Sequence, residues 1–313
     1  MNIVIPDDYQ NCVTTLACYQ KLAGHQVTIY NDTVKSMDDL VARFKDADAI
    51  VLTRERTRIT DELLARLPKL KLISQTGKVA NHIDMDACKR RGVTVMEGRG
   101  SGAATAELGM LLILSSLRRF TDEVARMKDG QWQGFVGRQL QGKTLGVLGF
   151  GRIGEQICQL GSAFGAKVVV WGRASSLAKA ASKGFAVASS REAFFSSCDI
   201  ISVQLRLIAE TKHYITAADL ALMKSDAIFV NTSRAELVEE DALASALKLG
   251  HPGFAAVDVY EDEPLLKNRH PLQDLSNCLC SPHIGFVEQD NYEMYFGTAF
   301  DNINSFAATA SAH

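Results

Sequence analysis

Short apolar runs alternate with amphipathic stretches along the first hundred residues. The runs are rich in β-branched residues and have the length of buried strands, and the stretches between them have helical spacing. The predicted strands are Asn2–Pro6, His25–Tyr30, Ala47–Thr53, Leu70–Ser74 and Gly92–Met96, and the predicted helices are Thr14–Leu22, Met37–Phe44, Asp61–Leu67 and Asp84–Arg90. This alternation predicts a parallel sheet with helices on both faces.

A glycine-rich break at 97–107 separates this series from a second one, and we interpret it as the crossing between two domains. A strongly apolar helix is predicted over Thr105–Phe120, with Thr105 as its N-cap and Glu107 in its first turn. It is expected to be buried, either within one chain or partly in a subunit interface. The strands predicted after it are Thr144–Phe150, Lys167–Gly172, Cys198–Leu205, Ala227–Ser233, Gly253–Tyr260 and Asn277–Pro282. The two series predict an α/β chain of two doubly wound domains.

Apolar residues near the end of the chain recur at three- and four-residue spacing. They are Tyr292, Tyr295, Phe296, Ala299, Ile303 and Phe306. This spacing predicts one face of an amphipathic helix, which we expect to pack on the N-terminal domain.

The composition is that of an ordinary globular protein, with 47% hydrophobic and 22% charged residues among 313. A net charge of -2 gives no reason to expect nucleic acid or an anionic membrane as partner. No apolar run approaches the ~20 residues of a membrane span, and the N-terminus does not look like a signal peptide. The seven cysteines include no C-x-x-C pair, so we expect reduced, structural cysteines, no metal site and a cytoplasmic location.

The segment LGVLGFGRIGEQI contains a G-x-G-x-x-G pattern at Gly149, Gly151 and Gly154. The first glycine permits a tight turn, the second lets the backbone approach a pyrophosphate, and the third allows close contact between helix and strand. The N-terminus of the following helix then receives the phosphates. Because the pattern lies between a predicted strand and a predicted helix, it predicts a dinucleotide site.

The next strand ends in Gly172 and Arg173, where NAD-binding chains usually have an acidic residue for the ribose hydroxyls. Arg173, and Arg206 after a later strand, can instead bind a 2′-phosphate. The alternative is that both arginines are solvated loop ends. The predicted cofactor is therefore NAD or NADP, with NADP favoured.

Polar residues of complementary chemistry follow three later strands, namely Arg234, Asp258 with Glu263, and His283. Taken singly, each has an ordinary structural or solvated role. Together they fit hydride transfer at a 2-hydroxy acid, because ligands of doubly wound sheets bind at the carboxyl ends of strands. Arg234 would hold the carboxylate, His283 would exchange the hydroxyl proton, and Glu263 would orient the imidazole.

Four segments, 142–154, 222–238, 255–265 and 281–285, resemble successive signatures of the D-isomer-specific 2-hydroxyacid dehydrogenase family. This family includes phosphoglycerate, glyoxylate/hydroxypyruvate and D-lactate dehydrogenases, and the resemblance covers nearly the whole chain. It implies that Arg234, Glu263 and His283 are catalytic. The cofactor contacts that it implies are Thr105, Arg152, Ile153, Thr232 and Asp258.

The resemblance also implies a Rossmann-type dinucleotide-binding domain, 101–285, inserted in a flavodoxin-like substrate domain, 1–100 plus 286–313, and a homodimer. The family's substrate-carboxylate loop matches 74–84, which gives Gly77, Lys78 and Val79 as substrate-binding residues. Lys78 either adds affinity for an anion or only faces solvent.

The chain departs from the family pattern at three positions. Gly172 replaces an acidic residue and Arg206 replaces a proline, and both changes weaken the expectation of NAD. Ala235 replaces the glycine after the catalytic arginine and indicates a subgroup whose substrate the pattern does not name.

The leading hypothesis is an NAD(P)-dependent oxidoreductase that acts on a small anionic substrate, a D-2-hydroxy acid or its 2-keto form. One alternative is a dinucleotide-sensing, corepressor-like binding protein, and another is the same fold oxidising a different small anion such as phosphite. The presence of all three catalytic residue types favours the enzyme. Glu263 argues against formate, because the family's formate enzymes have glutamine there.

Overall fold

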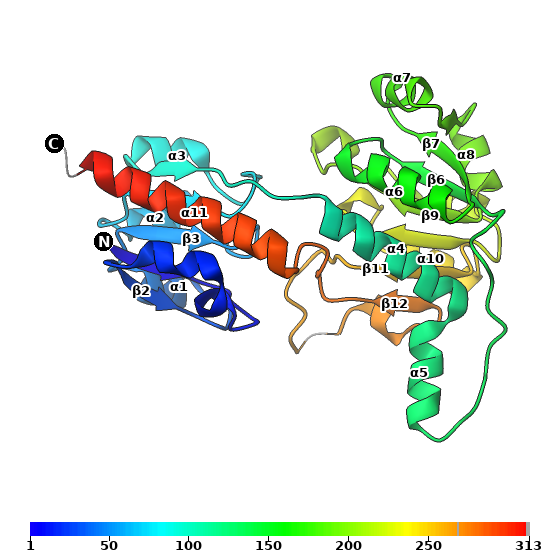
Figure 1. The fold of residues 1–313 in the computed structure, drawn as a ribbon, viewed down its shortest axis with the longest axis horizontal. Coiled ribbons are helices and arrows are strands. Elements are labelled where there is room, and N and C mark those ends of the chain that lie inside the picture. Colours follow the sequence, from blue (N-terminus) through cyan, green and yellow to red (C-terminus); the bar gives the residue numbers. More distant parts are fainter. Residues whose placement is uncertain (268, 311–313) are drawn as a thin grey trace. The chain divides into compact units, whose positions relative to one another are not determined.

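The computed structural model describes residues 1–267 and 269–310, and the chain divides into two compact units (Figure 1). The first comprises Met1–Ser101 together with the segment that begins at Glu288, and the second comprises Gly102–Val287. Each unit contains one parallel sheet, as predicted. Among the described residues, no helix combines the length and apolar character needed to cross a membrane.

The sheet of the first unit has the strand order β2-β1-β3-β4-β5, which is the flavodoxin-like order. Its strands are β1 Asn2–Ile5, β2 Gln26–Ile29, β3 Ala49–Leu52, β4 Leu72–Gln75 and β5 Thr94–Met96. Every residue of β3 is buried, and this explains why its sequence is a continuous apolar run rather than an alternating one.

The helices of the first unit are η1 Val13–Thr15, η2 Ala17–Leu22, α1 Met37–Phe44, α2 Asp61–Ala65, α3 Met85–Arg90 and α11 Gln289–Ala310. The side chains of Ser36, Thr60 and Asp84 cap α1, α2 and α3. The single helix predicted over Thr14–Leu22 is instead two 3-10 segments, because Leu16 has an extended backbone that separates them.

Helix α11 runs along the sheet of the first unit (Figure 1). The predicted apolar face is buried at Tyr292, Phe296 and Ile303. The Ser74 hydroxyl of β4 donates a hydrogen bond of 2.9 Å to the carbonyl of Ala299. The last helix of the chain therefore completes the core that the first hundred residues begin.

The sheet of the second unit has the order β12-β11-β10-β9-β6-β7-β8, which contains the Rossmann order. Its strands are β6 Thr144–Leu148, β7 Lys167–Trp171, β8 Ala186–Val187, β9 Ile200–Val203, β10 Ile228–Asn231, β11 Phe254–Val257 and β12 Cys278–Cys280. The order reverses between β6 and β9, where doubly wound sheets bind their ligands. Residues of β10 alternate between two cores: Phe229 belongs to one, and Ile228 and Val230 to the other.

The helices of the second unit are α4 Ala103–Arg118, α5 Phe120–Lys128, α6 Arg152–Ala163, α7 Ala174–Ser182, α8 Arg191–Ser197, η3 Ala209–Thr211, α9 Ala217–Leu222, η4 Ala235–Leu237, α10 Ala242–Leu249 and η5 Pro271–Asp274. The predicted N-cap of α4 is wrong: Gly102 is the N-cap, and Thr105 lies in the first turn. The helix also ends before Phe120, because Arg119 has a left-handed φ of 47°.

Candidate active site

The loop between β6 and α6 has the conformation that the glycine pattern requires. Gly149 has a φ of 99°, and a Cβ there would lie 2.6 Å from the carbonyl oxygen of Gln204. A Cβ on Gly154 would overlap the carbonyl of Gly149. Gly151 differs, because it is exposed and a Cβ on it would meet no protein atom within 4 Å. The missing side chain at Gly151 therefore leaves the N-terminus of α6 open to a ligand.

Gly172 lies against this loop. A Cβ on Gly172 would be 3.6 Å from the Cα of Gly149 and 3.6 Å from the Cβ of Ser176, which are ordinary contact distances. A Cβ would thus fit, so these contacts do not require a glycine at this position. Arg173 and Arg206 are both exposed, and they follow β7 and β9, the two neighbours of β6. Both arginines therefore lie on loops at the carboxyl ends of the strands, as the phosphate loop does.

His283 and Glu263 form a close pair. The Nδ1 atom of His283 is 2.5 Å from Oε2 of Glu263, and both side chains are partly exposed. The other carboxylate oxygen of Glu263 accepts the backbone N–H of Tyr260 at 2.9 Å. Because Glu263 is held at both oxygens, it fixes the orientation of the imidazole by engaging Nδ1 rather than Nε2.

Asp258 holds the loop that carries His283. Its carboxylate is fully buried and accepts hydrogen bonds from the Ser281 hydroxyl at 2.6 Å, the Ile284 N–H at 2.9 Å and the Gly285 N–H at 2.8 Å. Burial raises the pKa of Asp258, and these hydrogen bonds oppose that shift. In the structure Asp258 thus positions residues 281–285, and its predicted cofactor contact stays a prediction.

Thr105 and Thr232 are also hydrogen-bonded within the second unit. The Thr105 hydroxyl donates to the carbonyl of Gly285 at 2.8 Å, so α4 contacts the same loop as Asp258. Thr232 is mostly buried, and its hydroxyl accepts the Gln204 side-chain amide at 3.2 Å. Arg152 and Ile153 form the first turn of α6, directly after Gly151.

Arg234 is half-buried and follows β10, the strand next to the one that leads to Asp258. Its backbone carbonyl accepts the Asn231 side-chain amide at 2.9 Å, and its Nη1 donates to the Ser233 carbonyl at 2.6 Å. The guanidinium is therefore anchored close to the end of its own strand.

The predicted substrate loop, Gly77–Val79, belongs to the first unit, and Glu97 engages two of its groups. Nζ of Lys78 is 2.5 Å from Oε2 of Glu97, and the N–H of Val79 donates to Oε1 of Glu97 at 2.8 Å. The side chains of Lys78 and Glu97 are 76% and 39% exposed, so the ion pair is weakly held. An anionic ligand could therefore replace Glu97 at both donors.

Arg54 is a candidate that the sequence reasoning missed. It has a left-handed φ of 54°, its guanidinium lies over the Tyr295 ring at 5.5 Å, and a Cβ on Gly77 would overlap its Nη1. Arg54 therefore places a cation beside the substrate loop. The available signal was its position just after β3, the same criterion that identified Arg234 after β10.

Residues 110–285 match the family model described as D-isomer specific 2-hydroxyacid dehydrogenase, NAD binding domain. The D-3-phosphoglycerate dehydrogenase of Methanocaldococcus jannaschii is 36% identical over 251 residues, which cover 79% of this chain and 47% of that protein. The chain thus spans about half the length of that relative.

Two further proteins match over most of their own length. The glyoxylate reductase of Aeropyrum pernix is 34% identical over 280 residues, which cover 86% of this chain and 83% of that protein. The crystal structure of a phosphoglycerate oxidoreductase from Vibrio cholerae is 49% identical, covers 99% of both chains and has a TM-score of 0.96.

Proposed function

Because the chain belongs to the D-isomer-specific 2-hydroxyacid dehydrogenase family, we propose that it transfers a hydride between a nicotinamide cofactor and a small D-2-hydroxy acid or its 2-keto form. Membership bears out the family and the enzyme class predicted from the sequence, and the matched NAD binding domain supports a nicotinamide cofactor. The observation that carries the proposal is the 2.5 Å contact between His283 and Glu263. A histidine oriented by a carboxylate suits the proton exchange that accompanies hydride transfer at a hydroxyl-bearing carbon.

The residues present fit a dinucleotide, because Gly151 leaves the first turn of α6 uncovered. The amides of Arg152 and Ile153 would hold the pyrophosphate. We assign Thr105, Thr232 and Asp258 to the nicotinamide end of the site. When bound, the nicotinamide ring supplies the hydride acceptor or donor.

Arg234 would bind the substrate carboxylate through its planar guanidinium and polarise the reacting carbonyl. We also propose Gly77, Lys78 and Val79 of the first unit as substrate-binding residues, through their backbone amides, with the side chains of Lys78 and Arg54 adding positive charge beside them. In this proposal residues 1–100 plus 286–313 are the substrate domain and 101–285 the dinucleotide-binding domain. His283 would take the hydroxyl proton during oxidation and return it during reduction.

The activity is tested by following the absorbance of NADH and NADPH in turn with glyoxylate, hydroxypyruvate, pyruvate and phosphohydroxypyruvate. Turnover with at least one 2-keto acid is expected. Binding of the reduced cofactor without turnover on any of these substrates would instead favour the corepressor-like alternative.

NADP is the proposed cofactor preference, supported by Gly172 and by the exposed guanidinium groups of Arg173 and Arg206. The variant Gly172→Asp should raise the ratio of kcat/KM for NADH to that for NADPH by at least about tenfold, since the new carboxylate repels a 2′-phosphate. Gly172→Ala is the matched control, because it adds the Cβ without the charge. A wild-type preference for NADH would contradict the proposal.

A homodimer is proposed from the apolar surface of α4, α5 and the loop that follows, and α5 projects from the second unit (Figure 1). Side chains there are strongly exposed, namely Leu111 57%, Phe120 57%, Met127 67%, Trp132 74% and Val136 101%. Light scattering coupled to size exclusion should show a dimer, and Met127→Glu should shift it toward monomer. Leu249→Glu, at the exposed last residue of α10, is the control. A monomeric wild type would contradict the proposal.

A cytoplasmic location is also proposed. All seven cysteines are free thiols in the structure, and a reducing compartment keeps thiols in that state. Fractionation of cells that express the protein would test this.

A further inference from the structure

Cys278 and Cys280 form a thiol pair on β12, an edge strand of the second unit. Their Sγ atoms are 3.8 Å apart, because alternate residues of a strand share one face. Both residues are partly exposed. The proposed hydride transfer uses neither of them, so the pair is open to a separate role.

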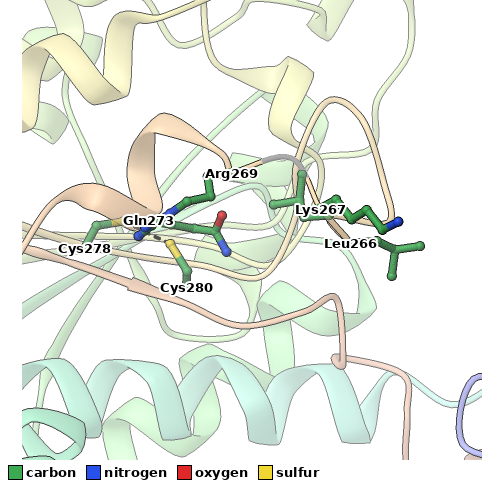
Figure 2. Close-up of a pocket in the computed structure, with 7 residues that line it drawn as sticks. Leu266, Lys267, Arg269, Gln273, Cys278 and Cys280 are labelled. Carbon is green, nitrogen blue, oxygen red and sulfur yellow. Dashed lines mark hydrogen bonds between the residues drawn. The ribbon is translucent and has the colours of Figure 1, made fainter.

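A cavity of about 420 Å³ lies beside the pair. Its other lining residues are Leu265, Leu266, Lys267, Arg269 and Gln273. Figure 2 shows Arg269 and Gln273 beside the two cysteines, and Leu266 and Lys267 further along the loop. Arg269 pairs with Asp274 at 2.7 Å, which offsets part of its charge, and Lys267 is the second cation of the lining. With Lys267 added to this pair, the lining has one positive charge more than the Asp274 carboxylate offsets, which favours an anionic ligand.

The hydrogen bond between the two thiols sets them apart from the other cysteines. Burial raises the pKa of the other five thiols to about 11 or 12, namely those of Cys12, Cys18, Cys88, Cys158 and Cys198. The 3.8 Å contact between the two Sγ atoms lets either thiol donate. With Cys278 as the donor, the pKa of Cys280 is lowered and that of Cys278 is raised, while burial opposes the shift at Cys280. The thiolate is the nucleophilic form, so in this arrangement Cys280 is the reactive member of the pair.

We propose that Cys280 is a modification site for anionic low-molecular-weight disulfides of the glutathione disulfide class, whose carboxylates Lys267 and Arg269 would bind. The Cys280 thiolate attacks one sulfur of the disulfide, the new Cys280 S–S bond forms, and the original S–S bond breaks. The departing half leaves as a thiolate and takes a proton from solvent. Cys280 is oxidised and the departing half is reduced, so the exchange needs no other reactant.

The modification would reach His283 through strand β12 and the residues that follow it, 281–285. Cys280 is paired in register with Val257, and the next residue, Ser281, donates its N–H to the Val257 carbonyl at 2.9 Å and its hydroxyl to Asp258. An adduct at Cys280 displaces this segment and with it His283. This effect on turnover rests on the proposed function, whereas the covalent addition does not.

The test incubates the whole protein with glutathione disulfide and measures intact mass and the modified peptide. One glutathione adduct at Cys280 is expected, with a loss of turnover that a dithiol reductant reverses. Cys280→Ser should lose the adduct and keep its turnover, and Cys12→Ser, which removes another partly exposed thiol, should behave as the wild type. An adduct on a different cysteine, or a loss of two hydrogens without adduct, would overturn the proposal.

A second measurement keeps both thiols and tests the cations. Wild-type protein should react faster with glutathione disulfide than with the neutral disulfide of 2-mercaptoethanol. The double variant Lys267→Gln, Arg269→Gln should reduce that preference by about tenfold at low salt. An unchanged preference would show that the cavity does not select anions. Mass addition without any change in turnover would contradict only the proposed link to His283.

Discussion

The His283 loop, residues 281–285, and the predicted substrate loop, Gly77–Val79, differ in what holds their polar groups. A fully buried Asp258 carboxylate holds the His283 loop through three hydrogen bonds. An exposed carboxylate, Glu97, holds the predicted substrate loop. Breaking the buried network leaves its donors without water or protein partners. Solvent or a ligand can instead replace the exposed Glu97 carboxylate. The comparison indicates a rigidly held segment around His283 and a carboxylate at Gly77–Val79 that solvent or a ligand can replace.

The largest expected effect is that of His283→Ala. Removing a general acid–base group should lower kcat by about 10²- to 10⁴-fold while the protein still binds the reduced cofactor, as monitored by its fluorescence. Glu263→Gln retains the imidazole of His283 and should lower kcat by a smaller factor. Survival of turnover with an unchanged pH profile would contradict the assigned proton exchange.

The next effect concerns stability. Asp258→Ala leaves two backbone N–H groups without their acceptor and removes the shorter of the two hydrogen bonds of the Ser281 hydroxyl, so the free energy of unfolding should fall by about 2–5 kcal/mol. Glu97→Gln should change it by no more than about 0.5 kcal/mol, as is usual at exposed positions. Urea titrations of both variants measure the contrast. Equal losses would show that the two loops are held alike.

Glu97→Gln should nevertheless change substrate binding. The variant keeps an acceptor for the Val79 N–H but no longer pairs with Lys78, so KM for the anionic substrate should fall by about two- to fivefold, the size of an exposed ion pair. Lys78→Gln should raise KM. If neither variant changes KM, the substrate does not use this loop.

The smallest expected effect lies beside the phosphate loop. Glu155 of α6 pairs with Lys179 at 2.9 Å and with Lys183, and hydrogen bonds from the two lysines lower its pKa. A carboxylate with a lowered pKa stabilises the folded state above its unfolded pKa of about 4.3, and that contribution is lost as the pH falls through the folded value. Glu155→Gln should therefore slightly lower Tm at pH 7, with the difference disappearing in acid. A constant difference would exclude this pairing as its cause.

Secondary structure was predictable where local pattern and burial agree. Strand β3 and helix α1 could be located from apolar runs, periodicity and the Ser36 cap. Strand β8 could not, because its two exposed residues carry no pattern. The end of α4 depends on the left-handed backbone of Arg119, a residue type that gives no signal for such a turn.

The sequence by itself determined the fold class, and it predicted the phosphate loop and the roles of Arg234, Glu263 and His283, because spacing and strand ends are short-range properties of the chain. Only the tertiary structure placed Glu97 against Lys78 and Val79, 19 and 18 residues away, and Arg54 against Gly77. It also placed Arg269 and Gln273 beside the Cys278–Cys280 pair. These contacts depend on which strands become neighbours and on side-chain rotamers, and no local pattern encodes either.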